Sequence, residues 1–564
     1  MIEYKKFFTK GDFMDTLIQS LLANDSSIWN TVIYIAMLFV FFAAMIAIGF
    51  ICRKKAKTSE GFVLGGRSVG PWLTAFAYGT SYFSAVVFVG YAGQFGWKFG
   101  IASTWIGLGN AVIGSLLAWV VLGRRTRIMT HHLNSSTMPD FFGKRYDSNA
   151  LKIASAIIIF VFLIPYTASL YNGLSRLFAM AFDIPFWTCI VVMALLTAIY
   201  VIAGGYMATA INDFIQGVIM LAGIVAVIVA VIVSKGGWSE IFKQLSLVND
   251  PSVSNQAGVF TSFFGPDVLA LGFVVILTSL GTWGLPQMVQ KFYAIKDETA
   301  IKKGIVISTL FAVVVSGGCY FLGGFGRLYP EAFENGGYDA IIPAMLSTLS
   351  PVLIGLVIVL VLSASMSTLS SLAMASSSTV TLDLIKPVFQ KNMSDKRQVL
   401  WMRGFIILFV ALSAAIAIVQ YYLQISFIAQ MMAVSWGALA GAFLAPFLYG
   451  LYSKRTTKTA VWFSFIYGVG VMALYLIYQF AFSKFFTLPA VLASPLNLGA
   501  LVMLSDLLFV PLISLFTAKP DKKRVDEIFS CYEKPISVPA SAVLVDEEGK
   551  REAACADENA SEKE

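Results

Sequence analysis

The chain alternates between long apolar stretches and short polar loops. About thirteen of the stretches are long enough to cross the ~30 Å hydrocarbon core of a bilayer as helices. They lie near residues 29–52, 71–97, 99–122, 150–180, 184–203, 206–234, 265–291, 301–328, 351–377, 399–422, 426–450, 456–482 and 494–517. The pattern predicts an all-α polytopic membrane protein with about 13 transmembrane helices, since a spanning helix satisfies its own backbone hydrogen bonds.

The charges in the loops predict the orientation. Basic clusters begin at Arg53, Arg124, Lys296, Lys386, Lys454 and Lys519. With thirteen crossings and an external N-terminus, every cluster falls on the cytoplasmic side, as the positive-inside rule requires. We therefore predict the N-terminus outside and the C-terminus inside. A polar leader (1–28) precedes the first span, and the polar, acidic segment 518–564 is predicted to be a disordered cytoplasmic tail.

Composition excludes several classes of protein. Mean hydropathy is +0.77, and only 13% of residues are charged, about half the share of a soluble protein. The net charge of +8 lies in the loops between spans, so we expect no nucleic-acid partner. The five cysteines show no paired spacing, and the two adjacent histidines lie in a polar loop. No nucleophile–base pair predicts an enzyme, and no obligate protein partner is inferred.

Two spans are interrupted at their middles. Glycine and polar residues occupy 77–84 in the second predicted span, and Gly281-Thr-Trp283-Gly284-Leu-Pro286-Gln287 interrupts the seventh, five spans later. One kink is ordinary in a membrane helix. Broken helices at matching positions of two halves instead indicate a midplane binding site in an inverted-repeat transporter.

A stripe of hydroxyls lies within the span 351–377. Ala364, Ser367, Thr368 and Ser371 recur at i, i+3, i+4 and i+7, with Ser370 beside them. Hydroxyls and carbonyls at this depth can replace the hydration shell of a small cation. The alternative is a face of small residues that lets two helices pack closely.

Asp213 is the only acid well inside a span of the first half. A carboxylate at membrane depth costs roughly 2.5–3.5 kcal/mol, so it needs a partner or a function. We find no Lys or Arg within a span at matching depth and predict a bound cation as the partner. The alternatives are a shallow aspartate that favours a helix N-terminus, and a proton-carrying group.

Several motifs together resemble the sodium:solute symporter family, over roughly residues 30 to 518. They are Leu64-Gly65-Gly66-Arg67-Ser68, Gly204-Gly205 with Asn212-Asp213 and Gln216, Gly284-Leu-Pro286, and Met366-Ser367-Thr368-Leu369-Ser370. Among members, the chain looks most like the pantothenate and proline symporters. The resemblance implies a LeuT-like 5+5 inverted repeat with discontinuous helices. It places an extra helix at 29–52, the two repeats at 71–234 and 265–450, and two C-terminal helices at 456–517.

The resemblance also implies sites for one or two coupling Na⁺ ions. The main Na⁺ site would use backbone oxygens of Thr80, Phe83 and Ala364 and the side chains of Ser367 and Thr368. A second site, present in some members, maps onto Asp213, Ser367, Ser370 and Ser371. Substrate-binding or gating residues would be Tyr82, Ser84, Tyr166, Trp283 and Gln287, although aromatic residues at a broken helix more often pack or gate than bind.

Departures from the family bear on the solute. The proline symporters carry an aspartate at the position of Tyr82, and Trp and Tyr at the positions of Thr278 and Thr282. Tyr166 matches their pattern. The arginine of the sialic-acid members has no counterpart at the matching depth of the fourth span.

We therefore expect Na⁺-coupled uptake of a small organic solute by alternating access, in the plasma membrane of a bacterium. The solute is expected to bear a carboxylate, as do proline, pantothenate and other monocarboxylates. The alternatives are a sialic acid or sugar symporter, an H⁺-coupled symporter, and a membrane sensor with a transporter fold. The polar tail is too short for an output domain, which counts against the sensor.

Overall fold

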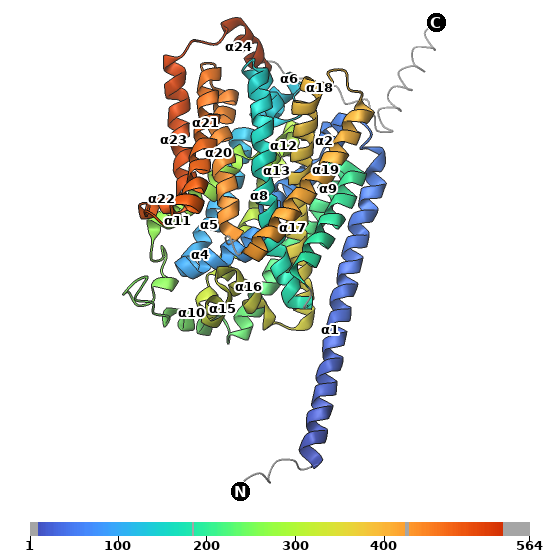
Figure 1. Ribbon diagram of the computed structural model, residues 1–564, viewed down its shortest axis with the longest axis vertical. Coiled ribbons are helices and arrows are strands. Elements are labelled where there is room, and N and C mark those ends of the chain that lie inside the picture. The colour runs from blue at the N-terminus through green and yellow to red at the C-terminus, as the bar shows by residue number, and fades with distance from the viewer. Residues whose placement is uncertain (1–9, 183–184, 424–427, 534–564) are drawn as a thin grey trace.

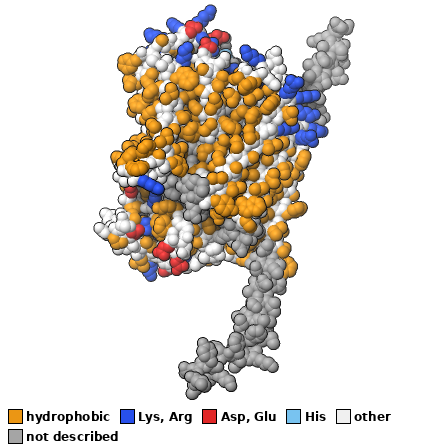
Figure 2. All heavy atoms as spheres, in the orientation of Figure 1, with side chains coloured by type: hydrophobic (Ala, Val, Ile, Leu, Met, Phe, Trp, Pro, Cys, Tyr) orange, Lys and Arg blue, Asp and Glu red, His pale blue; other side chains and the backbone are white. Residues whose placement is uncertain are grey.

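The computed structural model describes residues 10–182, 185–423 and 428–533 (Figure 1). About 85% of the structure is helical, and no β-strand occurs in the described ranges. Figure 2 shows a broad hydrophobic belt between two polar ends, with most of the visible Lys and Arg side chains at the end that carries α24. The protein is an all-α, multi-pass membrane protein.

The helices of the first half run from α1 to α10. Their bounds are α1 Lys10–Ile51, η1 Cys52–Lys54, α2 Ser59–Leu64, η2 Gly65–Arg67, α3 Pro71–Tyr82, η3 Val86–Tyr91, α4 Ala92–Phe99, η4 Gly100–Ser103, α5 Thr104–Gly109, η5 Asn110–Leu117, η6 Trp119–Gly123, α6 Arg124–His132, α7 Met138–Arg145, α8 Asn149–Phe182, α9 Phe186–Ser234 and α10 Trp238–Ser246.

The second half continues to the C-terminal helices. The bounds are η7 Val259–Thr261, α11 Val268–Leu280, η8 Gly281–Gly284, α12 Pro286–Tyr293, α13 Glu298–Ala312, η9 Val313–Gly317, α14 Gly318–Gly323, η10 Gly326–Leu328, α15 Pro330–Gly336, α16 Tyr338–Ser347, α17 Pro351–Thr379, η11 Val380–Ile385, α18 Lys386–Phe389, α19 Asp395–Leu423, α20 Ile428–Tyr452, α21 Lys458–Ile477, η12 Tyr478–Phe482, α22 Ala490–Ala493, α23 Pro495–Phe516, α24 Lys522–Phe529 and η13 Ser530–Tyr532.

Ten helices among the described residues are long and apolar enough to cross a membrane, and the bent pair Val268–Gly284 and Pro286–Tyr293 makes an eleventh. Two of the ten, Val86–His132 and Phe186–Ser234, have 47 and 49 residues. At 1.5 Å per residue each is about 70 Å long, more than twice the hydrocarbon thickness. Dividing them at Gly100 and Gly205, both of positive φ, and joining the short piece before Gly100 to α3 (Pro71–Tyr82), gives thirteen segments, the number predicted. The number of crossings, their orientation and the two repeats stay predictions.

Helical structure reaches into both of the predicted terminal segments. The predicted leader 1–28 continues as helix from Lys10, and α1 extends beyond the rest of the molecule (Figure 1). The predicted disorder from residue 518 is wrong for α24 and η13. Asp521 caps α24, and its apolar face buries Val525, Ile528 and Phe529. Residues 534–564 lie outside the described part of the chain.

Both predicted breaks are present, and each has a local cause. The helix α3 ends at Tyr82 because Phe83 is extended, with φ −106° and ψ 111°. The pair α11 and α12 is bent by 48° around Leu285, which is also extended. Pro286 explains the second break, since proline has no N–H to donate and disfavours the helical conformation of the preceding residue.

The helix α17 lies at the centre of the molecule. It packs against α9, α8, α19 and α1, and also against α3 and α12, which are the segments adjoining the two breaks. Every residue from Val357 to Thr379 is buried. This stretch of α17 is buried on every face, so its hydroxyls face other helices.

The helices α4 and α14 approach closely enough to require glycine. A Cβ added at Gly96 would lie 1.8 Å from the carbonyl oxygen of Gly323, whereas a Cβ at Gly272 in α11 would meet nothing within 4 Å. We expect Gly96→Ala to lower the free energy of unfolding by about 1–3 kcal/mol, because the two backbones must separate. Gly272→Ala is the control and should change stability little. Thermal unfolding of the purified protein in detergent measures both, and equal stability of the two variants would contradict the close approach.

Candidate functional site

The break after Tyr82 leaves carbonyl oxygens at the end of α3 without helical partners, as at any helix C-terminus. Side chains of α17 contact them. Ser367 Oγ donates to Thr80 O at 3.0 Å, and Thr368 Oγ1 lies 3.4 Å from both Thr80 O and Ser81 O. The same two hydroxyls lie 3.1 Å from Ala364 O on their own helix. The two central helices thus share a compact group of oxygens.

This oxygen group matches most of the predicted main Na⁺ site. Four of its five residues come together: Thr80, Ala364, Ser367 and Thr368. Phe83 lies in the break, but its carbonyl oxygen is not among the atoms that the two hydroxyls contact. Ser81 belongs to the group and was missed, because a carbonyl contact depends on where a helix ends and not on residue type. A hydroxyl that rotates its proton away offers a lone pair, so the group can coordinate a small hard cation.

The predicted partner of Asp213 is corrected by the structure. Asp213 Oδ2 lies 3.5 Å from Lys291 Nζ, and both side chains are almost fully buried. Lys291 is the last residue of the predicted span 265–291, where a lysine ordinarily extends to the interface. The bend at Leu285 and the packing of α12 against α3, α6 and α17 instead place it inside. The statement that no basic residue lies at matching depth is therefore wrong.

The predicted second Na⁺ set is only partly assembled. Lys291 Nζ donates to Ser371 Oγ at 2.9 Å, which links Ser371 to Asp213 through the ammonium. Ser367 faces α3, and Ser370 donates to Ser367 O at 2.9 Å. Ser371 Oγ lies 2.8 Å from Ser81 Oγ, so the two oxygen sets adjoin.

The predicted solute-facing residues are all buried near the two breaks. Tyr82 stacks on Phe83 and donates its hydroxyl proton to Thr278 O. Trp283 Nε1 donates to Ile113 O at 3.0 Å. The polar atoms of these two side chains therefore have protein partners, as expected of groups that pack or gate. The contact between Tyr82 and Thr278 joins two of the positions named above as expected departures from the proline symporters.

Other polar atoms in this region lack a protein partner. Tyr166 packs edge-on against Trp436 with ring centroids 5.9 Å apart, and Tyr82 lies 6.2 Å from the same indole. The unpartnered buried atoms of this region are Ser84 Oγ, Tyr166 Oη, Trp436 Nε1 and both amide atoms of Gln287. Buried polar groups are nearly always hydrogen-bonded, so such a set indicates a ligand or water. Trp436 was missed because an aromatic residue in an apolar span carries no local signal of its role.

Protein closes this region at both ends. At the end rich in Lys and Arg, Val69 N donates to Ala294 O and Lys296 N to Val69 O, both at 3.1 Å, and Arg127 Nε donates to Ile295 O. Burial lowers the pKa of the nearby Arg67, and the Glu60 carboxylate opposes that shift. At the opposite end α16 packs over η3, α4 and α8.

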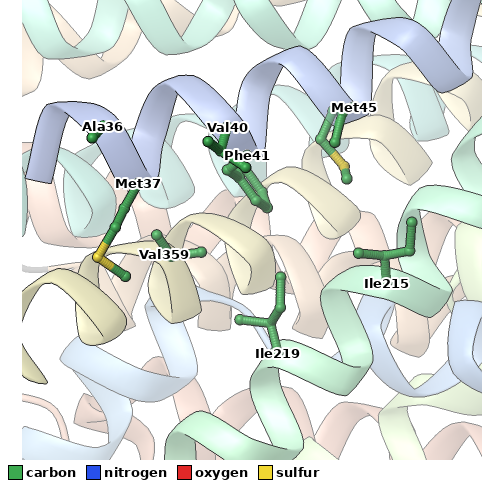
Figure 3. A pocket seen from close by; sticks show the side chains of 9 residues that line it. Ala36, Met37, Val40, Phe41, Met45, Ile215, Ile219 and Val359 are labelled. Atoms are coloured by element: carbon green, nitrogen blue, oxygen red, sulfur yellow. The ribbon is translucent and has the colours of Figure 1, made fainter. Parts of the chain in front are cut away.

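An open groove of about 480 Å³ lies away from this region (Figure 3). Its walls belong to α1, α9 and α17, and all its lining side chains are apolar: Ala36, Met37, Val40, Phe41, Ala44, Met45, Ile215, Ile219 and Val359. No described lining residue supplies a polar side chain, so the groove suits a lipid chain better than a polar solute.

Comparisons with known proteins agree on one family. The model of the sodium:solute symporter family matches residues 62–468. The osmoregulated proline transporter OpuE of Bacillus subtilis is 29% identical over 78% of this chain and 87% of its own. The sodium/proline symporter of Escherichia coli is 28% identical over 76% and 85%. The fold resembles that of a Na⁺-coupled sialic acid symporter solved in a substrate-bound, outward-open state, with a TM-score of 0.67 and 16% identity over 86% and 98% of the two chains.

Proposed function

The chain belongs to the sodium:solute symporter family, and within it we propose that the oxygen group between α3 and α17 binds the coupling Na⁺ and that the solute is a small carboxylate such as proline. The protein is a secondary transporter and not an enzyme; it couples Na⁺ to the transport of a small organic solute. The observation that carries the ion site is the contact of Ser367 and Thr368 with the free carbonyl of Thr80.

Sodium at this position would hold α3 and α17 together. The carbonyls belong to one helix and the hydroxyls to the other, so an ion coordinated by both disfavours any conformation that separates the helices. Solute would bind beside the same break, near Ser84 and Tyr166. Binding of the two ligands is coupled because both favour one arrangement of α3.

The chemistry of the unpartnered groups supports a carboxylate solute. Trp436 Nε1 is a donor only, and Tyr166 Oη and Gln287 Nε2 can donate. A carboxylate offers two acceptor oxygens to such donors. The named relatives include proline transporters, a further reason to test proline first.

The driving force sets how far solute can be concentrated. Each Na⁺ that crosses about 100 mV releases ~2.3 kcal/mol, and a tenfold sodium gradient adds ~1.4 kcal/mol. One ion therefore supports a gradient of a neutral or zwitterionic solute of roughly 500-fold, and two ions support roughly 10⁵-fold.

The assignment is tested by uptake into proteoliposomes. Radiolabelled proline, pantothenate, a monocarboxylate and a sialic acid are each offered with an inward Na⁺ gradient, with K⁺ in its place, and with a pH gradient alone. We expect Na⁺-dependent uptake of proline or another small carboxylate. Uptake driven by the pH gradient alone would contradict sodium coupling, and uptake of sialic acid alone would contradict the solute class.

Two glutamines of α12 offer a matched test of the solute site. Both amide atoms of Gln287 are unpartnered, whereas Gln290 Nε2 donates to Val63 O at 3.3 Å. Gln287→Met should raise the KM for solute about 10- to 100-fold, the worth of roughly one or two good hydrogen bonds, without lowering stability in the absence of solute. Gln290→Met should lower stability and leave KM near the wild-type value. Uptake kinetics and thermal unfolding measure the two effects, and an unchanged KM in Gln287→Met would remove Gln287 from the site.

A further inference from the structure

The buried lysine of α12 contacts two of the residues at which the family resemblance implies a second Na⁺. Lys291 is 2% exposed. Its Nζ contacts Asp213 Oδ2 at 3.5 Å and Ser371 Oγ at 2.9 Å, and the Tyr206 ring lies 5.2 Å away. Asp213 and Ser371 are two of the four residues predicted to coordinate a second Na⁺.

The ammonium supplies the positive charge that Asp213 needs. Neither carboxylate oxygen of Asp213 accepts a hydrogen bond from another described group, and Asp213 Oδ2 forms an ion pair with Lys291. An unpaired carboxylate at this depth is costly, and a lysine ammonium with its single positive charge and three donors meets the same requirement as a bound Na⁺.

The ammonium and a second Na⁺ are mutually exclusive at this position. Both would lie within a few ångströms of the same carboxylate and the same serine hydroxyl, and two like charges at such a distance repel strongly in a medium of low dielectric constant. Asp213 carries one negative charge, which one cation neutralises.

The main oxygen group includes neither Asp213 nor Ser371, so the ammonium does not take the place of an ion there. It is built from Thr80, Ser81, Ala364, Ser367 and Thr368. Ser371 Oγ lies between the Lys291 ammonium and this group, since it accepts from Lys291 Nζ and lies 2.8 Å from Ser81 Oγ. One position for a free ion therefore remains.

We propose that Lys291 acts as a tethered cation in the second ion position, so that this transporter binds and carries one Na⁺ per solute molecule. The proposal rests on the proposed function, because it presupposes a Na⁺ site at the main oxygen group. It also places a fixed charge on α12, the half-helix beside the second break. The protein would then concentrate a zwitterionic solute at most about 500-fold where a two-ion transporter reaches about 10⁵-fold.

The experiment counts bound sodium. Equilibrium binding of ²²Na⁺ to the purified full-length protein should saturate at one ion in the wild type, with a Hill coefficient near 1. Lys291→Met removes the tethered charge and leaves Asp213 free, so saturation should rise to two ions. Lys291→Arg keeps a cation and should remain at one. Lys291→Met with Thr368→Ala should lose the main-site ion and keep the ion at Asp213.

The number of ions separates the outcomes. Two ions in the wild type would overturn the proposal and leave the proposed function intact, and so would a Lys291→Met variant that still binds one ion. Wild-type protein that binds no sodium would overturn the proposed function and the tethered cation with it. If Lys291→Met does not fold, the wild-type count decides, and Lys291→Met with Asp213→Asn, which contains no unpaired charge, should fold and bind one ion.

Discussion

Replacing both Ser367 and Thr368 by alanine should abolish sodium-stimulated uptake. At sodium concentrations that drive uptake by the wild type, the initial uptake rate should fall at least about 100-fold. The two hydroxyls are the side-chain oxygens of α17 that contact the carbonyls of Thr80 and Ser81. Without them a bound cation keeps the carbonyls but loses two ligands that replace its water. If each ion–hydroxyl contact is worth about as much as a hydrogen bond to a charged group, the two together contribute roughly 3–6 kcal/mol. This corresponds to a factor of about 100 or more in Na⁺ affinity.

A serine of the same helix provides the control. Ser365 is equally buried, but its Oγ donates to Val361 O at 2.8 Å within α17. Ser365→Ala should retain sodium-dependent uptake close to wild type. The measurement is initial uptake rate against sodium concentration in proteoliposomes. Near-normal sodium dependence in the double variant would show that the hydroxyl stripe only packs α17 against α3.

The breaks and the oxygen group illustrate what the sequence could predict. Pro286 after Gly284 determines a helix break locally, because the missing N–H and the restricted preceding residue act without tertiary contacts. The hydroxyls recur at helical spacing, so their shared face follows from periodicity alone. Which carbonyls they meet depends on where α3 ends, and the contribution of Ser81 could not be read from its residue type.

Lys291 shows why the remainder could not be predicted. A lysine at the end of an apolar span ordinarily extends toward water, and local sequence favours that interpretation. Its depth depends on a bend of 48° and on the position of α12 between α3 and α17. The helix α24 is different, since an Asp521 cap followed by apolar residues at i, i+3 and i+4 was a local signal that could have predicted it.

Asp213→Asn should destabilise the protein by about 3–5 kcal/mol, because it leaves the Lys291 ammonium buried without a counter-charge. Whether the substitution lowers stability depends on which cation is the partner of Asp213. Were a free ion the partner, the substitution would remove a buried charge and cost no stability in the absence of sodium. Adding Lys291→Met to Asp213→Asn removes the remaining charge, so the pair of substitutions should restore most of the lost stability.

A second buried aspartate separates the effect of charge pairing from that of burial. Asp506 in α23 is 1% exposed and accepts a hydrogen bond from Ser464, a contact that asparagine can also make. Asp506→Asn should therefore change the free energy of unfolding by no more than about 1 kcal/mol. Denaturant or thermal unfolding of the four proteins, measured without sodium, gives the comparison. An Asp213→Asn variant as stable as Asp506→Asn would show that the ammonium does not depend on Asp213, and the ion pair would then contribute nothing to holding α9 against α12.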